Sequence, residues 1–242
     1  MRQVPSYLLI GNGRVARHFQ HYFSMLNLVY TQWHRQQPLS ELRQGIEQAT
    51  HILILVSDGV IEDFIDEYLS ASRAVLIHFS GSLVTEKAYG AHPLMTFAHE
   101  LYDRAQYQAI PFILDHDAPA FCELLPGLPN QSVRLHKSLK PRYHALCVLS
   151  GNFSCLLWQK LFQTFEQELQ IPASAAHPYL LQQTQNLLSH FPTALTGPLA
   201  RGDAATLKKN LSALENDPYQ RVYQSFMDCY ADLVQENKHE HF

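Results

Sequence analysis

Residues 7–16, YLLIGNGRVA, decide the fold of the first half of the chain. An apolar run typical of a buried strand leads into Gly11 and Gly13, and an apolar stripe that begins at Val15 predicts a helix after them. In such a unit the first glycine permits the turn, the second lets the backbone approach a pyrophosphate, and Ala16 lets the helix pack close to the sheet. The stretch therefore predicts a dinucleotide-binding turn, with a purely structural turn as the alternative.

The residues after this turn alternate short apolar runs with helix-like stretches. Apolar runs at 26–33, 51–56 and 74–79 are separated by helical patterns at 39–48 and 60–70. Alternation of this period predicts an α/β fold, a Rossmann-type parallel sheet with helices on both faces. Further strands are predicted at 109–114 and 132–135, with a short helix at 118–125 between them.

From residue 141 onward the pattern is helical. Helices are predicted at 143–169, 178–190, 204–214 and 218–235, with breaks where Pro and Gly gather. Asp203 is expected to cap the third of them. We therefore expect a nucleotide-binding Rossmann-like domain over residues 1–138 and an all-helical domain over residues 139–242 that serves substrate binding and dimerisation.

Composition argues against several classes of partner. The 18 Lys and Arg residues are scattered and the net charge is -4, so nucleic acid is not expected. The apolar runs are the size of strands, well below the roughly 20 residues of a membrane helix, so we expect no membrane partner and a cytoplasmic protein.

Metal and disulfide chemistry are not expected either. The four cysteines form no CxxC pair and sit among apolar residues, which predicts small core residues in a reducing compartment, without disulfides or cysteine-bound zinc. Despite 14 histidines, no HExxH motif or carboxylate-rich grouping occurs, so no metal site is predicted.

The end of the second predicted strand indicates which cofactor the turn would bind. The stretch QWHRQ carries no Asp or Glu for the ribose hydroxyls of NAD and instead places His34 and Arg35 there. A guanidinium can grip a 2'-phosphate and stack on adenine, which favours NADP(H), although an ordinary surface arginine would look the same. The cofactor-binding residues predicted around the turn and this strand are Gly11, Asn12, Gly13, Arg14, Val15, Ala16, His34 and Arg35.

Polar residues also follow the third and fourth predicted strands. Ser57 and Asp58 follow one, and His78, Ser80 and Gly81 belong to HFSGS at the end of the other. Ligands of open parallel sheets bind where the strands end, so these residues are expected to border the same cleft, with His78 lining the nicotinamide pocket. For Asp58, capping the next helix is an equally good explanation.

Three later stretches occur together with these: GAHPLMTF at 90–97, YHALCVLSGN at 143–152 and TALTGPLARGD at 193–203. With them, the whole chain resembles Rossmann-like proteins that carry a C-terminal domain of unknown function, grouped with deazaflavin-dependent NADP oxidoreductases. The resemblance implies an architecture similar to 6-phosphogluconate dehydrogenase, pyrroline-5-carboxylate reductase and ketopantoate reductase. It thereby implies a homodimer through the helical domain, and hydride transfer with a small carbonyl, imine or alcohol metabolite bound between the domains.

The sequence departs from these relatives in its acid–base group. They carry a Lys and an Asn on the first long helix of the second domain; Asn152 can match the Asn, but no Lys lies within residues 143–152. His144 is the available substitute, because histidine is a side chain that ordinarily exchanges protons near neutral pH. The predicted catalytic residues are Asn152, His144 and His78, while a capping or buried structural role for His144, and a helix-backbone contact for Asn152, are the alternatives.

Arg201, Thr196 and His92 are predicted to bind substrate. A guanidinium at Arg201 could hold an anionic group, with a structural salt bridge as the alternative, and His92 would fix the turn at Pro93. Because the acid–base lysine has no counterpart, a sensor that binds NADP(H) or another nucleotide without turnover is the competing function.

Overall fold

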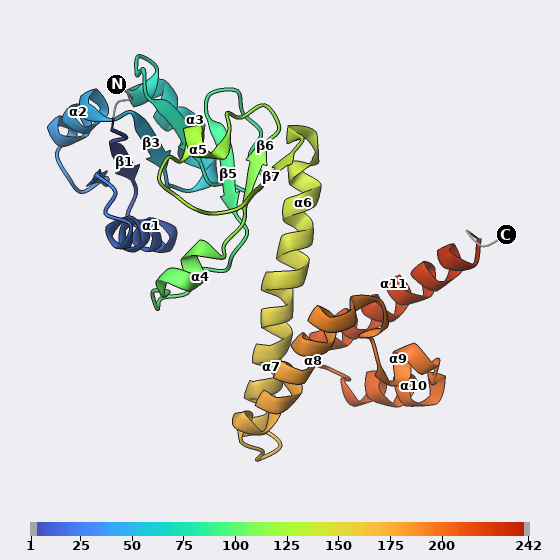
Figure 1. Cartoon of the computed structure of the whole chain (residues 1–242). Helices are drawn as coiled ribbons and strands as arrows, with labels where there is room; N and C mark the ends of the chain where they lie inside the picture. Colours follow the sequence, from blue (N-terminus) through green and yellow to red (C-terminus); the bar gives the residue numbers. More distant parts are fainter. Residues whose placement is uncertain (1–3, 240–242) are drawn as a thin grey trace. The chain divides into compact units, whose positions relative to one another are not determined.

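The structure is a computed structural model that describes residues 4–239 (Figure 1). Contacts divide the chain into a first unit that ends at Leu157 and a second that begins at Trp158. The sequence predicted a boundary at 138/139, shortly after the last strand ends at Leu135, and the contacts group the helix that begins at Lys140 with the sheet as far as Leu157.

The described part of the first unit contains one seven-stranded sheet with the order β2-β1-β3-β4-β5-β6-β7. Strands β1 to β5 pair in parallel, β6 runs antiparallel to β5, and β7 is parallel to β6. The predicted Rossmann-type α/β fold with a helical C-terminal part is confirmed. The strands are β1 Tyr7–Ile10, β2 Tyr30–Trp33, β3 His51–Ile54, β4 Val75–His78, β5 Tyr89–Pro93, β6 Phe112–Asp115 and β7 Ser132–Leu135.

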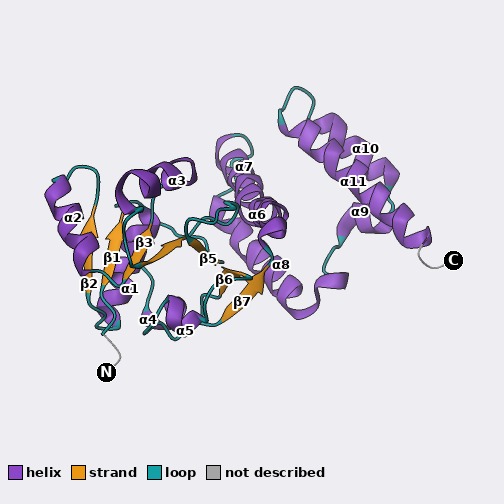
Figure 2. Ribbon diagram, turned by 90° about the horizontal axis from the view of Figure 1, so that it is seen from above, coloured by secondary structure: helices purple, strands orange, loops and turns teal. Residues whose placement is uncertain are grey.

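Helices cover both faces of this sheet, as Figure 2 shows. One face packs against α1 (Arg14–Met25), α4 (Arg104–Gln108) and α5 (Phe121–Leu124), and the other against α2 (Leu39–Gln48) and α3 (Ile61–Phe64), which continues as a π-helical turn, Ile65–Leu69. In β1 the side chains alternate between these two cores, yet all four are buried. A strand buried on both faces reads as an unbroken apolar run, which is why YLLI was recognisable.

A long helix leaves the sheet and leads into the second unit. It consists of α6 (Lys140–Cys147), a π-helical turn (Val148–Phe153) and α7 (Ser154–Gln167). The remaining helices are α8 His177–His190, α9 Gly197–Arg201, α10 Ala204–Ala213 and α11 Tyr219–His239. The predicted cap is confirmed, because the Thr206 N–H donates to the Asp203 carboxylate at 3.1 Å.

The expectation that the cysteines are core residues is wrong. Cys122, Cys155 and Cys229 are exposed and Cys147 is half-buried, so the cysteines are not core residues; neighbours apolar in sequence do not place a helical residue on the buried side. In addition, one helix among residues 4–239, Lys137–Gln167, is long and apolar enough to cross a membrane by length and composition alone. Its first turn, however, packs on the sheet through charged and polar side chains.

Gly11 is required by the fold itself. Its φ of +133° is rarely adopted by L-residues, and a Cβ there would lie 2.3 Å from the Leu55 carbonyl oxygen. Gly13 has an ordinary φ of -75°, and a Cβ there would meet nothing within 4 Å. The two glycines of the turn therefore answer to different constraints.

We expect Gly11→Ala to lower the free energy of unfolding by about 2 kcal/mol or more, because backbone strain and a clash with backbone add together. Gly13→Ala, the matched control, changes it by less than about 1 kcal/mol, the cost of a poorer N-cap. Urea denaturation of the three proteins measures both values. Equal stability of the two variants would contradict the turn geometry.

Candidate functional site

The turn between β1 and α1 is fixed by its neighbours on both sides. The Gly11 N–H donates to the Trp33 carbonyl at 2.8 Å, and the Gln32 amide of β2 donates to the Gly11 carbonyl at 2.8 Å. On the other side, Gly11 passes against Leu55 at the end of β3. The turn is therefore held in place before any ligand binds, and the structural interpretation accounts fully for Gly11.

The same interpretation does not account for Gly13. Gly13 is the N-cap residue of α1 and supplies no side-chain cap, and the first turn of the helix carries no acidic residue. The free N–H groups at the start of this 12-residue helix, and the positive end of its dipole, thus lie beside a glycine around which the space is open. This arrangement suits a phosphate. Asn12 and Arg14 are exposed beside it, while Ala16 is fully buried, as close helix packing requires.

His34 and Arg35 lie directly after the β2 residue that bonds to Gly11. Trp33 pairs with Ile10, so the loop after β2 begins beside the glycine turn, as the sequence predicted. The His34 N–H donates to Gln37 at 2.8 Å, which shapes this loop, and Arg35 is exposed. The Arg35 guanidinium is therefore exposed in a loop that begins beside the glycine turn.

Asp58 does not cap the helix that follows it. Ser57 holds the N-cap position of the 3-10 turn Asp58–Val60, without a side-chain cap. The Asp58 carboxylate instead accepts a hydrogen bond from the Ser80 hydroxyl at 2.5 Å, and Ser80 accepts one from the Leu83 N–H at 2.9 Å. The capping alternative is wrong, because the loop after β4 offers Asp58 a closer donor than its own helix.

The sheet changes from apolar to polar side chains along the line of paired residues at which β3 and β4 end. Ile54 of β3 pairs with His78 of β4, and His78 pairs with Gly90 of β5. Gly90 is followed in this line by Asp115 of β6, whose carboxylate accepts the Gly90 N–H at 2.7 Å. The apolar core thus gives way to a buried histidine and a buried carboxylate where the strands β3 and β4 end.

Lys140, the first residue of α6, completes this line. Its ammonium lies 2.8 Å from Asp115, and the two side chains are only 6% and 1% exposed. Gly90 leaves the space they need, because a Cβ there would lie 2.5 Å from the Lys140 Nζ. Neither Lys140 nor Asp115 was predicted from the sequence as a site residue.

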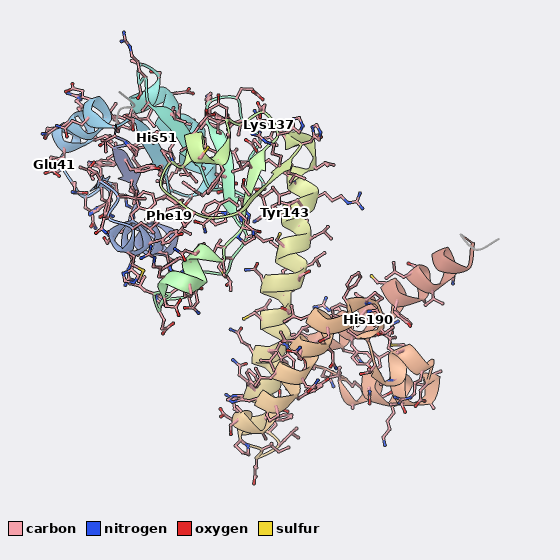
Figure 3. All side chains as sticks on the ribbon, viewed as in Figure 1. Phe19, Glu41, His51, Lys137, Tyr143 and His190 are labelled. Carbon is pink, nitrogen blue, oxygen red and sulfur yellow. The ribbon has the colours of Figure 1, made fainter. Side chains whose placement is uncertain are left out.

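Beside the ion pair, α6 brings Tyr143 and His144 onto the ends of β4 and β5. Tyr143, labelled in Figure 3, bonds through its hydroxyl to His92 Nδ1 at 2.7 Å. The rings of His92 and His144 meet edge to face, with centroids 5.9 Å apart, and both rings pack over Gly81. The structure therefore brings together the predicted residues His92, His144 and Gly81, and adds Tyr143, which was not predicted. We call His92, Tyr143 and His144 the histidine–tyrosine cluster.

Burial keeps the two strand-end histidines neutral. It lowers the pKa of His92 to about 4, with smaller contributions from His144 and Lys140, against an opposing one from Asp58. The pKa of His78 is also lowered to about 4, mainly by burial and then by Lys140. Burial likewise raises the pKa of the Tyr143 hydroxyl, so neither His92 nor Tyr143 carries a charge near neutral pH.

His78 has no exposed surface. Its Nδ1 accepts the Ser80 N–H at 3.3 Å, so the proton of the neutral ring lies on Nε2. Nε2 is buried without a hydrogen-bond partner among residues 4–239. A catalytic contact of His78 with a ligand would therefore need local movement, and its predicted role stays a prediction.

The other residues with predicted catalytic or substrate-binding roles lie outside the sheet and its loops. Asn152 lies exposed in the π-helical turn, two turns beyond His144. Thr196 and Arg201 belong to the second unit, at the N-cap position and in the last turn of α9, and Arg201 is exposed. Their roles stay predictions. Within the described residues, no group of three or more His, Cys, Asp or Glu side chains could hold a metal ion.

Comparison with known proteins supports the same architecture. Residues 110–228 match a family model described as a domain of unknown function, DUF2520. This segment is just under half of the chain and contains Asp115, Lys140, Tyr143 and His144. No curated protein matches the chain in sequence.

Solved structures with the same fold span nearly the whole chain. A putative NADP oxidoreductase, BF3122 from Bacteroides fragilis, is similar with a TM-score of 0.75 at 18% identity, over 94% of this chain and 98% of that one. Protein TM1727 from Thermotoga maritima reaches 0.65 at 20% identity, over 96% and 99%. A reductive aminase from Aspergillus terreus, in complex with NADPH and ethyl levulinate, reaches 0.61 at 14% identity, over 97% and 95%. At these identities the likeness establishes the fold.

We expect the protein to lose stability as the pH falls from about 6.5 to about 4. In this window the unfolded chain protonates histidines that the folded chain keeps neutral. Each of His78 and His92 therefore lowers the free energy of unfolding by on the order of 3 kcal/mol when the pH reaches about 4. Above pH 6.5 both states are neutral there, and this contribution to the pH dependence vanishes.

The test is urea denaturation across this pH window for the wild type and a His78→Leu variant. The variant should show a shallower loss, and His136→Gln, which alters an exposed ring, should behave as wild type. Identical slopes for wild type and His78→Leu would contradict the assignment of a buried neutral histidine.

Proposed function

We propose that the protein is an NADP(H)-dependent oxidoreductase acting on a small carbonyl, imine or alcohol metabolite. The observation that carries the proposal is the uncapped N-terminus of α1 behind an open Gly13, at the same sheet edge as the histidine–tyrosine cluster. One element suits a diphosphate, and the other suits proton exchange. Similar folds in a structure named as a putative NADP oxidoreductase and in a reductive aminase in complex with NADPH support the proposal.

The residues present fit the cofactor. The free N–H groups of α1 would hold the phosphates and Arg35 would meet the 2'-phosphate, while Gly81 leaves room for the rings of His92 and His144. When bound, NADPH would supply the hydride. The chain itself would orient the cofactor and move a proton through His92, Tyr143 or His144.

We further propose a homodimer through the helical region, as the resemblance implies. Leu146, Leu149 and Phe153 form a stripe at helical spacing along α6 and the π-helical turn, and each is about half exposed in the single chain. In the described part of the second unit, Ala176 and Leu207 are the buried apolar residues. Helices this poorly covered call for a partner surface, and light scattering that gives twice the mass of one chain would support a dimer.

Arg35→Ala should weaken NADPH binding more than NADH binding. Loss of the guanidinium removes charge-assisted hydrogen bonds to a 2'-phosphate, so we expect the affinity ratio of NADPH to NADH to fall by roughly 10-fold or more. Calorimetric titration of both cofactors gives the ratio. Arg17→Ala, on the exposed side of α1, is the control. An unchanged ratio in Arg35→Ala would overturn the NADP(H) assignment.

Turnover separates the enzyme from the sensor, which the missing acid–base lysine keeps open. The enzyme predicts steady oxidation of NADPH in a panel of keto acids and cyclic imines. Tight NADPH binding with no turnover across the panel, and with a changed oligomeric state, would favour a nucleotide sensor. Oxidation only when a deazaflavin is present, followed by its absorbance, would identify that hydride partner.

A further inference from the structure

Lys140 and Asp115 form a buried ion pair in which both carboxylate oxygens accept a hydrogen bond. One Asp115 oxygen accepts from Lys140 at 2.8 Å and the other from the Gly90 N–H at 2.7 Å. Buried charges are costly unless they are paired and hydrogen-bonded, so a pair retained at the end of an otherwise apolar sheet calls for a role. Its partners come from β5, β6 and α6, three elements far apart in sequence.

The position of Lys140 suggests that role. Lys140 begins α6, and Tyr143 and His144 lie one helical turn later. Fixing the first turn of the helix on Gly90 and Asp115 therefore also fixes the Tyr143 hydroxyl against His92, which is two residues beyond Gly90 on β5. The ion pair and the histidine–tyrosine cluster share the same strand and the same helix turn.

Lys140 is poorly suited to give up a proton itself. Its ammonium is bound to a carboxylate and its side chain is 6% exposed, so a ligand has little access to it. It stands three residues before the segment in which an acid–base lysine was sought, but it faces Asp115.

We propose that the Lys140–Asp115 ion pair is a positioning element that holds His92, Tyr143 and His144 in place for proton transfer. The proposal rests on the oxidoreductase function proposed above. Tyr143 Oη and His92 Nδ1 share a hydrogen across 2.7 Å. When the Tyr143 hydroxyl gives its proton to the reduced substrate, the Nδ1–H proton of a neutral His92 can pass to the Tyr143 oxygen while His92 Nε2 takes a proton from water, which leaves as hydroxide. The ring is then the Nε2–H tautomer, and proton exchange with solvent restores the Nδ1–H form.

The charge of Lys140 acts on the same cluster. The groups that influence His92 are His144 and Lys140 of α6, which favour the neutral ring, and Asp58 before α3, which favours the charged ring. The pKa of His78 is affected by the charges of Lys140, Asp115, Asp58 and Lys137. Removal of the Lys140 charge should therefore raise the pKa of His92 toward its ordinary value, although burial still holds it down.

The test uses histidine-detected NMR titration of the full chain. In Lys140→Met, and in the double variant Lys140→Met/Asp115→Leu, the titration midpoint of His92 should move upward, with the signal assigned from His92→Gln. The double variant avoids an unpaired buried carboxylate and keeps the test valid if the single variant fails to fold. Lys137→Met is the matched control, because Lys137 pairs with Glu86 and Asp117 and is not among the groups that shift His92.

Kinetics add a readout that packing alone would not move. With a substrate from the panel, the folded double variant should lose roughly 10- to 100-fold in kcat, the scale of a misplaced catalytic group, while its Kd for NADPH stays within about 2-fold. An unmoved His92 midpoint, or an unchanged kcat and pH profile in the folded double variant, would overturn the proposal. Failure of the wild type to bind NADPH would instead overturn the proposed function, and the NMR result would stand apart from it.

Discussion

Parallel pairing of β1, β3, β4 and β5 is the constraint on which the rest of the first unit depends. Because these strands run in one direction, the loops that follow them emerge at one edge of the sheet. The glycine turn, the Asp58 loop, the Ser80 loop and His92 are thereby brought together from four separate parts of the sequence. The proposed cofactor binding and proton chemistry can meet because the register of the strands places the glycine turn and the histidine–tyrosine cluster at the same edge.

The same edge is where the sheet departs from an apolar interior. After His51, which begins β3, the side chains of β3 and β4 are aliphatic up to the last position of β4, where His78 stands next to Gly90, near Asp115 and Lys140. Two charges with almost no exposure cost free energy of desolvation, which their mutual contact and the Gly90 N–H offset. The costly ion pair lies beside the histidine–tyrosine cluster. Departures from an apolar interior are expected at functional sites, which supports a functional role for this edge of the sheet.

Local signals in the sequence were sufficient for the turn and for most elements. The stretch YLLIGNGRVA predicts the strand, the turn and the start of the helix that the structure shows. Strand β7 and helix α2 also fall within their predicted ranges. Strand β5 was missed because YGAHP contains Gly and Pro, which disfavour strands; pairing with β4 and β6 forms it despite this composition. Helix α4 was missed for a related reason, since five residues offer too little periodicity.

The site was harder to predict because its decisive contacts are long-range. Lys140 reads as an ordinary lysine at a helix start and Asp115 as a residue at a strand end; nothing local shows that they meet. Gly90, which lies opposite Asp115, is a sequence feature that indicates this contact. It can be interpreted once the register of β5 and β6 is known. Tyr143 was passed over for its neighbour His144, although the Tyr143 hydroxyl makes the hydrogen bond to His92.

A crystal structure of the protein with NADPH tests the central claim most directly, through the distances from the diphosphate to the first turn of α1 and from the nicotinamide C4 to the nearest side chains. The account predicts that the diphosphate contacts the N–H groups after Gly13 and that C4 lies within a few ångströms of His92, Tyr143 or His144. A diphosphate bound elsewhere, or a nicotinamide ring with none of these three side chains beside it, would contradict it.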